Sequence, residues 1–190
     1  MTPITRPELT RRNFALGATA LTTLSACGNG IGGNGAATID ARVNSALAFM
    51  YSNYPGTRDL ANKSSGMLVM PLVTEAGLGL GGSYGRGALQ VGGSTVDYYS
   101  ITTGSAGFQI GAQQSSHVLF FMTQESLLDF RRASGWAAGA DIEYALNDQG
   151  DSIRAETTTS LAPVIAVVFA QAGFRAGATV EGAKYTRIIP

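Results

Sequence analysis

Apolar residues recur at α-helical spacing shortly before residue 55. The apolar stripe consists of Val43, Leu47, Met50, Tyr51 and Tyr54. These positions share one face of a helix, for which Thr38-Ile39-Asp40 offers N-cap candidates and Pro55-Gly56 marks the end. We expect the stripe to pack on the domain; the alternative, a membrane-facing amphipathic helix, has Arg42 alone where a basic rim is needed. A second short helix is expected at residues 57–64, with Leu60 pointing inward.

Beyond residue 65 the pattern changes to short apolar or alternating segments rich in β-formers. Strands are expected at residues 67–71, 95–101, 108–112, 118–122, 140–144, 157–159, 164–169 and 177–188. One helix interrupts them, capped by Thr123, running through Arg132 and ended by Ser134-Gly135. Long helical crossovers are missing from the pattern, which argues against a doubly wound sheet. The predicted fold class is mainly β (α+β): a compact antiparallel β-sandwich or barrel-like domain with an N-terminal helix and one or two short helices.

Composition agrees with one small globular domain. The chain has 190 residues, of which 14% are charged and 45% apolar. Of its 25 glycines, 12 fall between residues 66 and 113, which indicates twisted strands, bulges and tight turns. Basic and acidic residues both number 13, so a strongly basic nucleic-acid binder is excluded. A single Cys excludes an intrachain disulfide, and a single His excludes a His-rich metal site.

The N-terminal segment has the pattern of an export signal. The charges of Arg11 and Arg12 precede a run of small and apolar residues that ends at Ala26. This run is shorter than the about 20 residues that a spanning helix needs, so residues 1–26 are predicted to be a cleavable signal peptide. The two arginines with Asn13-Phe14 resemble the twin-arginine export motif. An ordinary signal peptide that carries two arginines is the alternative.

Leu24-Ser25-Ala26-Cys27 resembles a bacterial lipobox. The Cys27 thiol would take a diacylglycerol, and fatty chains such as palmitate would hold the protein on a membrane; a chance cysteine beside a cleavage site is the alternative. Five glycines in residues 28–35 predict a flexible tether. The expected domains are 1–26 (signal), 27–37 (acylated Cys and tether) and 38–190 (folded domain). Gly28 is not the aspartate that retains many lipoproteins at the inner membrane, so the periplasmic side of the outer membrane is favoured.

Three patterns suggest chemistry, and each has a structural alternative. Residues 77–82 match G-x-G-x-x-G, but no helix start follows, so close backbone packing with bulges is expected in place of a nucleotide site. His117 lacks a G-x-S-x-G partner motif and is expected to be an exposed or hydrogen-bonded residue at a strand end. Asp141 and Glu143 share one strand face. We expect the two carboxylates to form a solvated surface; acid–base catalysis or cation binding is the alternative. No cofactor, no metal site and no enzymatic activity are expected.

Cations matter for any lipid contact. Without residues 1–26 the chain has 10 basic and 12 acidic residues and a net charge of −2, so contact needs a local basic patch, an apolar surface or the acyl anchor. Arg86 lies among glycines, where a phosphate could approach the backbone. Lys184 and Arg187 flank Tyr185, whereas Arg131-Arg132 mainly complement a helix dipole. We expect Arg86, Lys184 and Arg187 to contact lipid.

Several blocks of the chain, in their order and spacing, resemble the SYLF family, also called Ysc84-like. The blocks are residues 66–71, 76–87, 98–99, 107–113, 119–123, 130–131, 134–136, 139–141, 157–159 and 166–182. The resemblance covers residues 39–190 and implies phospholipid binding without catalysis. Eukaryotic relatives bind phosphoinositides and some bind actin, while bacterial relatives are often exported lipoproteins. Lipid contact in the eukaryotic relatives is tied to a basic N-terminal helix, which here has Arg42 alone, and actin does not fit an export signal.

Two functional hypotheses follow. The first is a lipid-anchored periplasmic protein whose domain contacts phospholipid membranes. The second is an envelope interaction or assembly module that binds a protein partner and has no lipid chemistry of its own. An enzyme built around His117 is a third, and a cleft that holds His117 with a serine and a carboxylate would support it.

Overall fold

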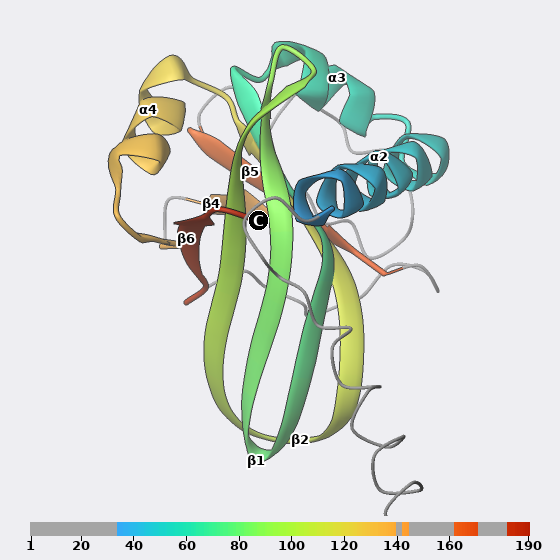
Figure 1. The fold of residues 1–190 in the computed structure, drawn as a ribbon, viewed down its shortest axis with the longest axis vertical. Helices are drawn as coiled ribbons and strands as arrows, with labels where there is room; N and C mark the ends of the chain where they lie inside the picture. Colours follow the sequence, from blue (N-terminus) through green and yellow to red (C-terminus); the bar gives the residue numbers. More distant parts are fainter. Residues whose placement is uncertain (1–33, 140–141, 145–161, 171–181) are drawn as a thin grey trace, which may run out of the picture. The chain divides into compact units, whose positions relative to one another are not determined.

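One curled sheet with three helices makes up the described part of the chain. The computed structural model describes residues 34–139, 142–144, 162–170 and 182–190. The helices are α2 (Gly35–Asn53), α3 (Thr57–Lys63) and α4 (Gln124–Arg132). The strands are β1 (Gly66–Val91), β2 (Ser94–Phe121), β3 (Trp136–Ala137), β4 (Ile142–Tyr144), β5 (Val164–Phe169) and β6 (Lys184–Ile188). Figure 1 shows that β1 and β2 form a long hairpin between α2 and α4.

The β1–β2 hairpin is longer than the sequence pattern predicted. Four expected strands, at residues 67–71, 95–101, 108–112 and 118–122, are parts of two continuous strands of 26 and 28 residues. The polar and glycine-rich stretches between them remain paired because a bulge, here between Leu78 and Leu80, accommodates extra residues without ending the ladder. Gly92 and Gly93, with φ of 58° and 79°, form the turn, a conformation that favours glycine. Both strands bend at the bottom of Figure 1 and return upward.

β2 is the central strand of the sheet. It pairs with β1 along one edge, and along the other with β6 at residues 98–102 and with β5 at residues 116–121. The order is β3-β6-β2-β5-β4, and β4 with β5 is the one parallel pair among the described strands. The predicted mainly antiparallel β fold is confirmed. The expected strand at residues 157–159 lies outside the described residues, as do residues 140–141 and 177–181.

The inner face of the curled sheet holds the first hydrophobic core. Because the hairpin bends, apolar residues from both halves of β1 and β2 meet there with β5, β6 and α4. This core includes Leu68, Met70, Leu89, Tyr99, Ile101, Leu119, Phe121, Phe130 and Tyr185. Gly87 allows the close approach of the two halves of β1, since a Cβ there would overlap the carbonyl oxygen of Val69 and lie 2.9 Å from the Met70 Cα.

The outer face of the sheet is covered in part by α2. The predicted stripe is buried at Val43, Leu47 and Met50 and packs on an outer-face cluster. That cluster includes Val69, Ala88, Val118, Phe120, Ile165 and Val167. The stripe therefore belongs to the core, as expected. The predicted N-cap is wrong: the cap residue is Asn34, four to six residues before the expected candidates Thr38-Ile39-Asp40, and α2 begins at Gly35.

The two short helices match their predictions. α3 buries Leu60, and α4 begins after Thr123, whose hydroxyl accepts a hydrogen bond from the Ser126 N–H at 3.1 Å. This side-chain cap satisfies one of the free donors at the start of the helix. Phe130 then anchors α4 on the inner core, where its ring lies 4.7 Å from the Tyr99 ring and 4.8 Å from the Phe121 ring, measured between centroids.

Candidate functional site

Two rows of side chains cross the outer face of the sheet beside α2. Strand pairing aligns Tyr84, Thr102 and Lys184 in one row and Arg86, Ser100 and Thr186 in the next. The row between them contains Ile101 and Tyr185, which are buried in the inner core. Because side chains alternate between the faces of a strand, the six residues project from the outer face. We call these six residues the open rows.

The open rows form an accessible basic surface. Tyr84 is 55% exposed, Thr102 and Lys184 are exposed, and the other three are half-buried. The rows combine two cations with four hydroxyl-bearing side chains and contain no acidic residue. Among the described residues neither Arg86 nor Lys184 forms an ion pair. The structure thus places two of the three cations that the sequence singled out on one face, Arg86 on β1 and Lys184 on β6, with β2 between them. The Lys184 side chain lies against Gly135, where an added Cβ would be 2.7 Å from its Cε.

The start of α2 lies next to the open rows. Asp40, which the sequence suggested as a cap, instead accepts hydrogen bonds from the hydroxyls of Tyr98 (2.8 Å) and Thr95 (3.0 Å). Burial and, to a lesser extent, the bond to Asp40 raise the pKa of Tyr98. Tyr98 precedes Ser100 by two residues on the same face of β2, so the first turns of α2 are one row away from Arg86. At the same end, a Cβ on Gly35 would lie 3.0 Å from the carbonyl carbon of Pro190.

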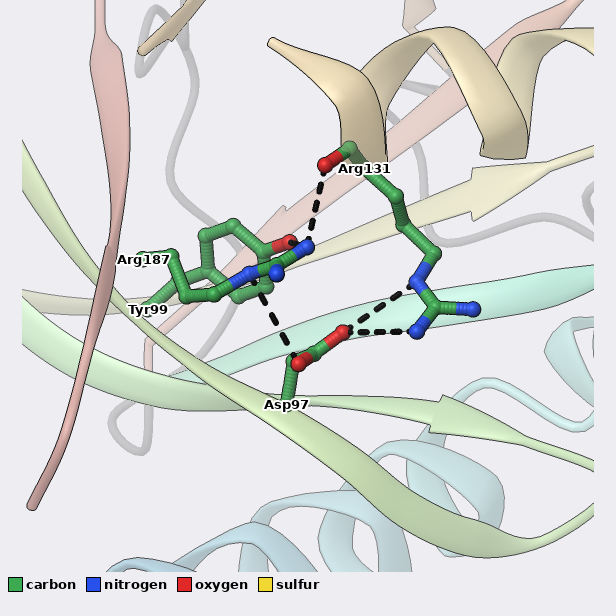
Figure 2. A network of polar contacts seen from close by, with 4 residues as sticks. All are labelled: Asp97, Tyr99, Arg131 and Arg187. Carbon is green, nitrogen blue, oxygen red and sulfur yellow. Dashed lines mark hydrogen bonds and ion pairs between the residues drawn. The ribbon is translucent and has the colours of Figure 1, made fainter. Parts of the chain in front are cut away.

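Arg187 lies on the other face, in the four-residue cluster of Figure 2. The Asp97 cluster consists of Asp97, Tyr99, Arg131 and Arg187. Arg131 Nε and Nη2 lie 3.1 Å and 3.0 Å from Asp97 Oδ2. Arg187 Nε lies 3.6 Å from Asp97 Oδ1, and its Nη2 donates to the Arg131 carbonyl oxygen at 2.9 Å and to the Tyr99 hydroxyl at 3.4 Å. The hydrogen bond to Tyr99 is the main cause that raises the pKa of Arg187.

The Asp97 cluster joins three elements of the fold. Arg131 belongs to the last turn of α4, Asp97 and Tyr99 to β2, and Arg187 to β6. Its contacts therefore fix the end of α4 against the sheet. The sequence analysis missed this role and assigned Arg131 to the helix dipole. The pairing of Tyr99 with Arg187 in the sheet register was the missing information, because it depends on strands 88 residues apart.

His117 is buried on the inner face. It is 5% exposed, its Nε2 lies 2.9 Å from the Ser115 Oγ, and burial lowers its pKa to about 4. The imidazole is therefore neutral at neutral pH. Its Nδ1 has no hydrogen-bond partner in the described part of the chain, so no carboxylate completes a Ser–His–acid arrangement there. The expected hydrogen bond is present, but the expected position is wrong: β2 continues to Phe121 and pairs with β5 at Val168, which encloses His117 within the sheet.

The other sequence patterns do not form a reactive or ligand-binding site within the described residues. Residues 77–82 lie in β1, which bulges as expected and continues to Val91 without a helix. Asp141 lies outside the described residues, so its pairing with Glu143 stays a prediction. The described residues contain no group of three or more His, Cys, Asp or Glu suited to a metal ion, and none of their helices is long and apolar enough to cross a membrane. Arg11, Arg12 and Cys27 lie outside the described residues.

A family model matches the C-terminal part of the domain. Residues 102–187 match Ysc84, described as Las17-binding protein actin regulator. The match extends from the middle of β2 through α4 to β6 and contains Lys184 and Arg187, whereas Arg86 lies before it. No curated protein matches the chain.

Proposed function

Since this chain belongs to the Ysc84 (SYLF) family, we propose that it is a non-catalytic, membrane-anchored lipoprotein whose domain binds phospholipid. Cys27 is its lipidation site, and Arg11-Arg12 belong to its export signal. The protein resides in the cell envelope on the periplasmic side, with the outer membrane favoured. The family description refers to actin regulation, but the export pattern at residues 1–26 argues against actin as a partner here.

The open rows carry this proposal. A phospholipid phosphate presents several strong acceptor oxygens, and charge-assisted hydrogen bonds from Arg or Lys are the strongest that a surface offers. Arg86 and Lys184 share one open face with the Thr102 hydroxyl between them, whereas the Ser100 hydroxyl donates to the Thr186 carbonyl oxygen at 3.4 Å. This local charge is needed because the domain without its signal has a net charge of −2, so attraction over the whole domain would be unfavourable.

Arg187 contributes less to lipid contact in this proposal. Its side chain is 49% exposed, but Nε and Nη2 already interact with Asp97, Tyr99 and the Arg131 carbonyl. A phosphate that recruited Arg187 would have to compete with these contacts. Arg86 and Lys184 are therefore the main lipid-contacting residues, and Arg187 is a structural cation.

Vesicle sedimentation tests lipid binding apart from the anchor. Residues 34–190 form one compact unit with all described helices and strands, so this segment is the soluble form to use. We expect it to bind vesicles of phosphatidylethanolamine and phosphatidylglycerol, and to bind phosphatidylcholine vesicles weakly. Each cation near an anionic surface contributes about 1 kcal/mol, so the double variant Arg86→Gln/Lys184→Gln should bind about 25-fold more weakly.

The matched control is Lys63→Gln/Arg132→Gln, which removes two charges from exposed positions of α3 and α4. It should reduce binding much less than the open-row variant. Failure of the soluble domain to bind either kind of vesicle, together with recovery of one stoichiometric protein partner, would favour an envelope assembly module. Intact mass of the native protein tests the anchor separately, since cleavage before Cys27 and added acyl chains change the mass directly.

A further inference from the structure

We propose that the domain docks in cis: the open rows lie on the same bilayer that holds the acyl chains of Cys27. This inference rests on the proposed lipid anchor and adds the orientation of the domain. The outer face beside the start of α2 then faces the membrane, and α4 on the inner side faces away. A domain held this way does not bridge two membranes.

The first argument is the length of chain between the anchor and the fold. Cys27 and Asn34, where the described chain begins, are seven residues apart in the sequence. Fully extended, that length spans at most about 25 Å. The start of α2 is therefore restricted to a short distance from the membrane surface.

The second argument is the position of the open rows relative to that start. The Asp40–Tyr98 hydrogen bond of 2.8 Å fixes the first turns of α2 over the row that contains Tyr98. Ser100 and Arg86 are in the next row, about 7 Å farther along the strands. The row of Lys184 follows after a similar step, so both cations lie within about 14 Å of the Tyr98 row along the strands.

The third argument is the chemistry of this surface. Positive side chains are attracted to anionic lipid over roughly one Debye length, about 8 Å at physiological salt. Tyr84, 55% exposed beside the two cations, has the amphipathic ring that is favoured at a membrane–water interface.

The opposite side of the sheet offers a poorer match. Leu128 of α4 is 42% exposed, but Glu125 and Asp129 lie on the same short helix. Arg131, the helix's partly buried cation, interacts with Asp97 at 3.0 Å. Phe130 fixes α4 to the inner core, whereas α2 packs on the outer cluster, so the two surfaces cannot face one bilayer together (Figure 1).

The test uses the native acylated protein. Cys27 is the sole cysteine and its thiol is consumed by acylation, so one introduced cysteine gives a single site for a fluorophore. Label Tyr84→Cys in one sample and Leu128→Cys in another, and reconstitute each in vesicles of phosphatidylethanolamine and phosphatidylglycerol that contain a headgroup-nitroxide lipid. We expect severalfold stronger quenching at position 84 than at position 128. Thr102→Cys, a second open-row site, should behave like position 84.

Charge removal then separates docking from anchoring. In the labelled protein, Arg86→Gln/Lys184→Gln should shift the balance between docked and undocked domain by about 25-fold and abolish the quenching at position 102, while the protein stays with the vesicles. Equal quenching at positions 102 and 128, or stronger quenching at 128, in protein that is acylated by mass would overturn cis docking and leave the proposed lipoprotein intact. Native protein without acyl chains would overturn both.

Discussion

Arg86 and Arg187 are both cations of the same sheet, yet they have opposite surroundings. Arg86 projects from the outer face and forms no ion pair with the described residues. Arg187 projects from the other face, where Asp97, Tyr99 and the Arg131 carbonyl interact with its Nε and Nη2. Its side chain is 49% exposed, but this exposure does not measure how available its guanidinium donors are to a ligand. The comparison shows that a cation in contact with solvent is free for a ligand only if the fold has not already satisfied its donors.

The same contrast extends to the two faces as a whole. The inner face excludes solvent around His117, so its imidazole stays uncharged and pairs with Ser115, whereas the charges of the Asp97 cluster lie on a partly exposed part of that face. The outer face exposes two rows of polar side chains where α2 does not cover it. Charge is thus costly in the buried part of the inner face and accessible to a ligand on the outer face.

The largest effect that we expect from this contrast is the pH dependence of stability caused by His117. Its pKa is about 4 in the folded protein against about 6.5 when unfolded. Above pH 6.5 both states are neutral and this group has no effect. As the pH falls from 6.5 to 4, the unfolded chain binds a proton that the folded protein does not, so stability decreases, by about 3 kcal/mol in total.

Urea unfolding of the wild type and of His117→Gln across this pH range measures the difference, since carboxylates titrate in both proteins. The variant should lack the His117 component of the loss. An NMR titration of the native protein gives a second readout: the imidazole should remain neutral at pH 5, and protonation near pH 6.5 would show that the inner face tolerates charge.

The next test concerns the close approach that forms the inner face. Gly87→Ala places a methyl group against the backbone at Val69 and Met70, which cannot move as a side chain end could. We expect a loss of about 1–3 kcal/mol, as is usual for overpacking. Thermal or urea unfolding measures it.

Gly104→Ala is the matched control for Gly87→Ala. It lies in the same hairpin, where an added Cβ meets no atom within 4 Å, and its unfolding free energy should change little. Equal losses in the two variants would mean that the strand conformation, and not the contact between the halves of β1, determines the effect of an alanine.

Replacing the two arginines should give the smallest change in stability. It should also separate their roles most clearly. Arg187→Gln should lower the unfolding free energy by at most about 1 kcal/mol, because the ion pair is partly exposed, and should change vesicle binding little. Arg86→Gln should do the reverse: an unchanged unfolding midpoint with weaker binding to anionic vesicles. If both variants change the unfolding midpoint and the vesicle binding to the same extent, the distinction between a structural and a ligand-contacting cation is wrong.

Local patterns predicted the local elements well. The stripe through Val43 and Leu47, the Thr123 cap and the apolar segment at residues 164–169 each depend on neighbours within a few residues. β3 was missed because its two residues carry no periodicity and form a strand only by pairing with β6. The N-cap of α2 was misplaced because Asp40 bonds to Thr95 and Tyr98 of a distant strand, an alternative that helix-start rules do not include.

The sequence alone determined the mainly β class, the short helices, the apolar stripe of α2 and the set of candidate cations, since these depend on composition and short-range spacing. The tertiary structure decided which cations act together. Arg86 shares a face with Lys184 and not with Arg187 because each strand places alternate side chains on opposite faces and the register of β1, β2 and β6 sets the alignment. A one-residue change of register would exchange the faces, and no local pattern specifies the pairing of strands so far apart in the chain.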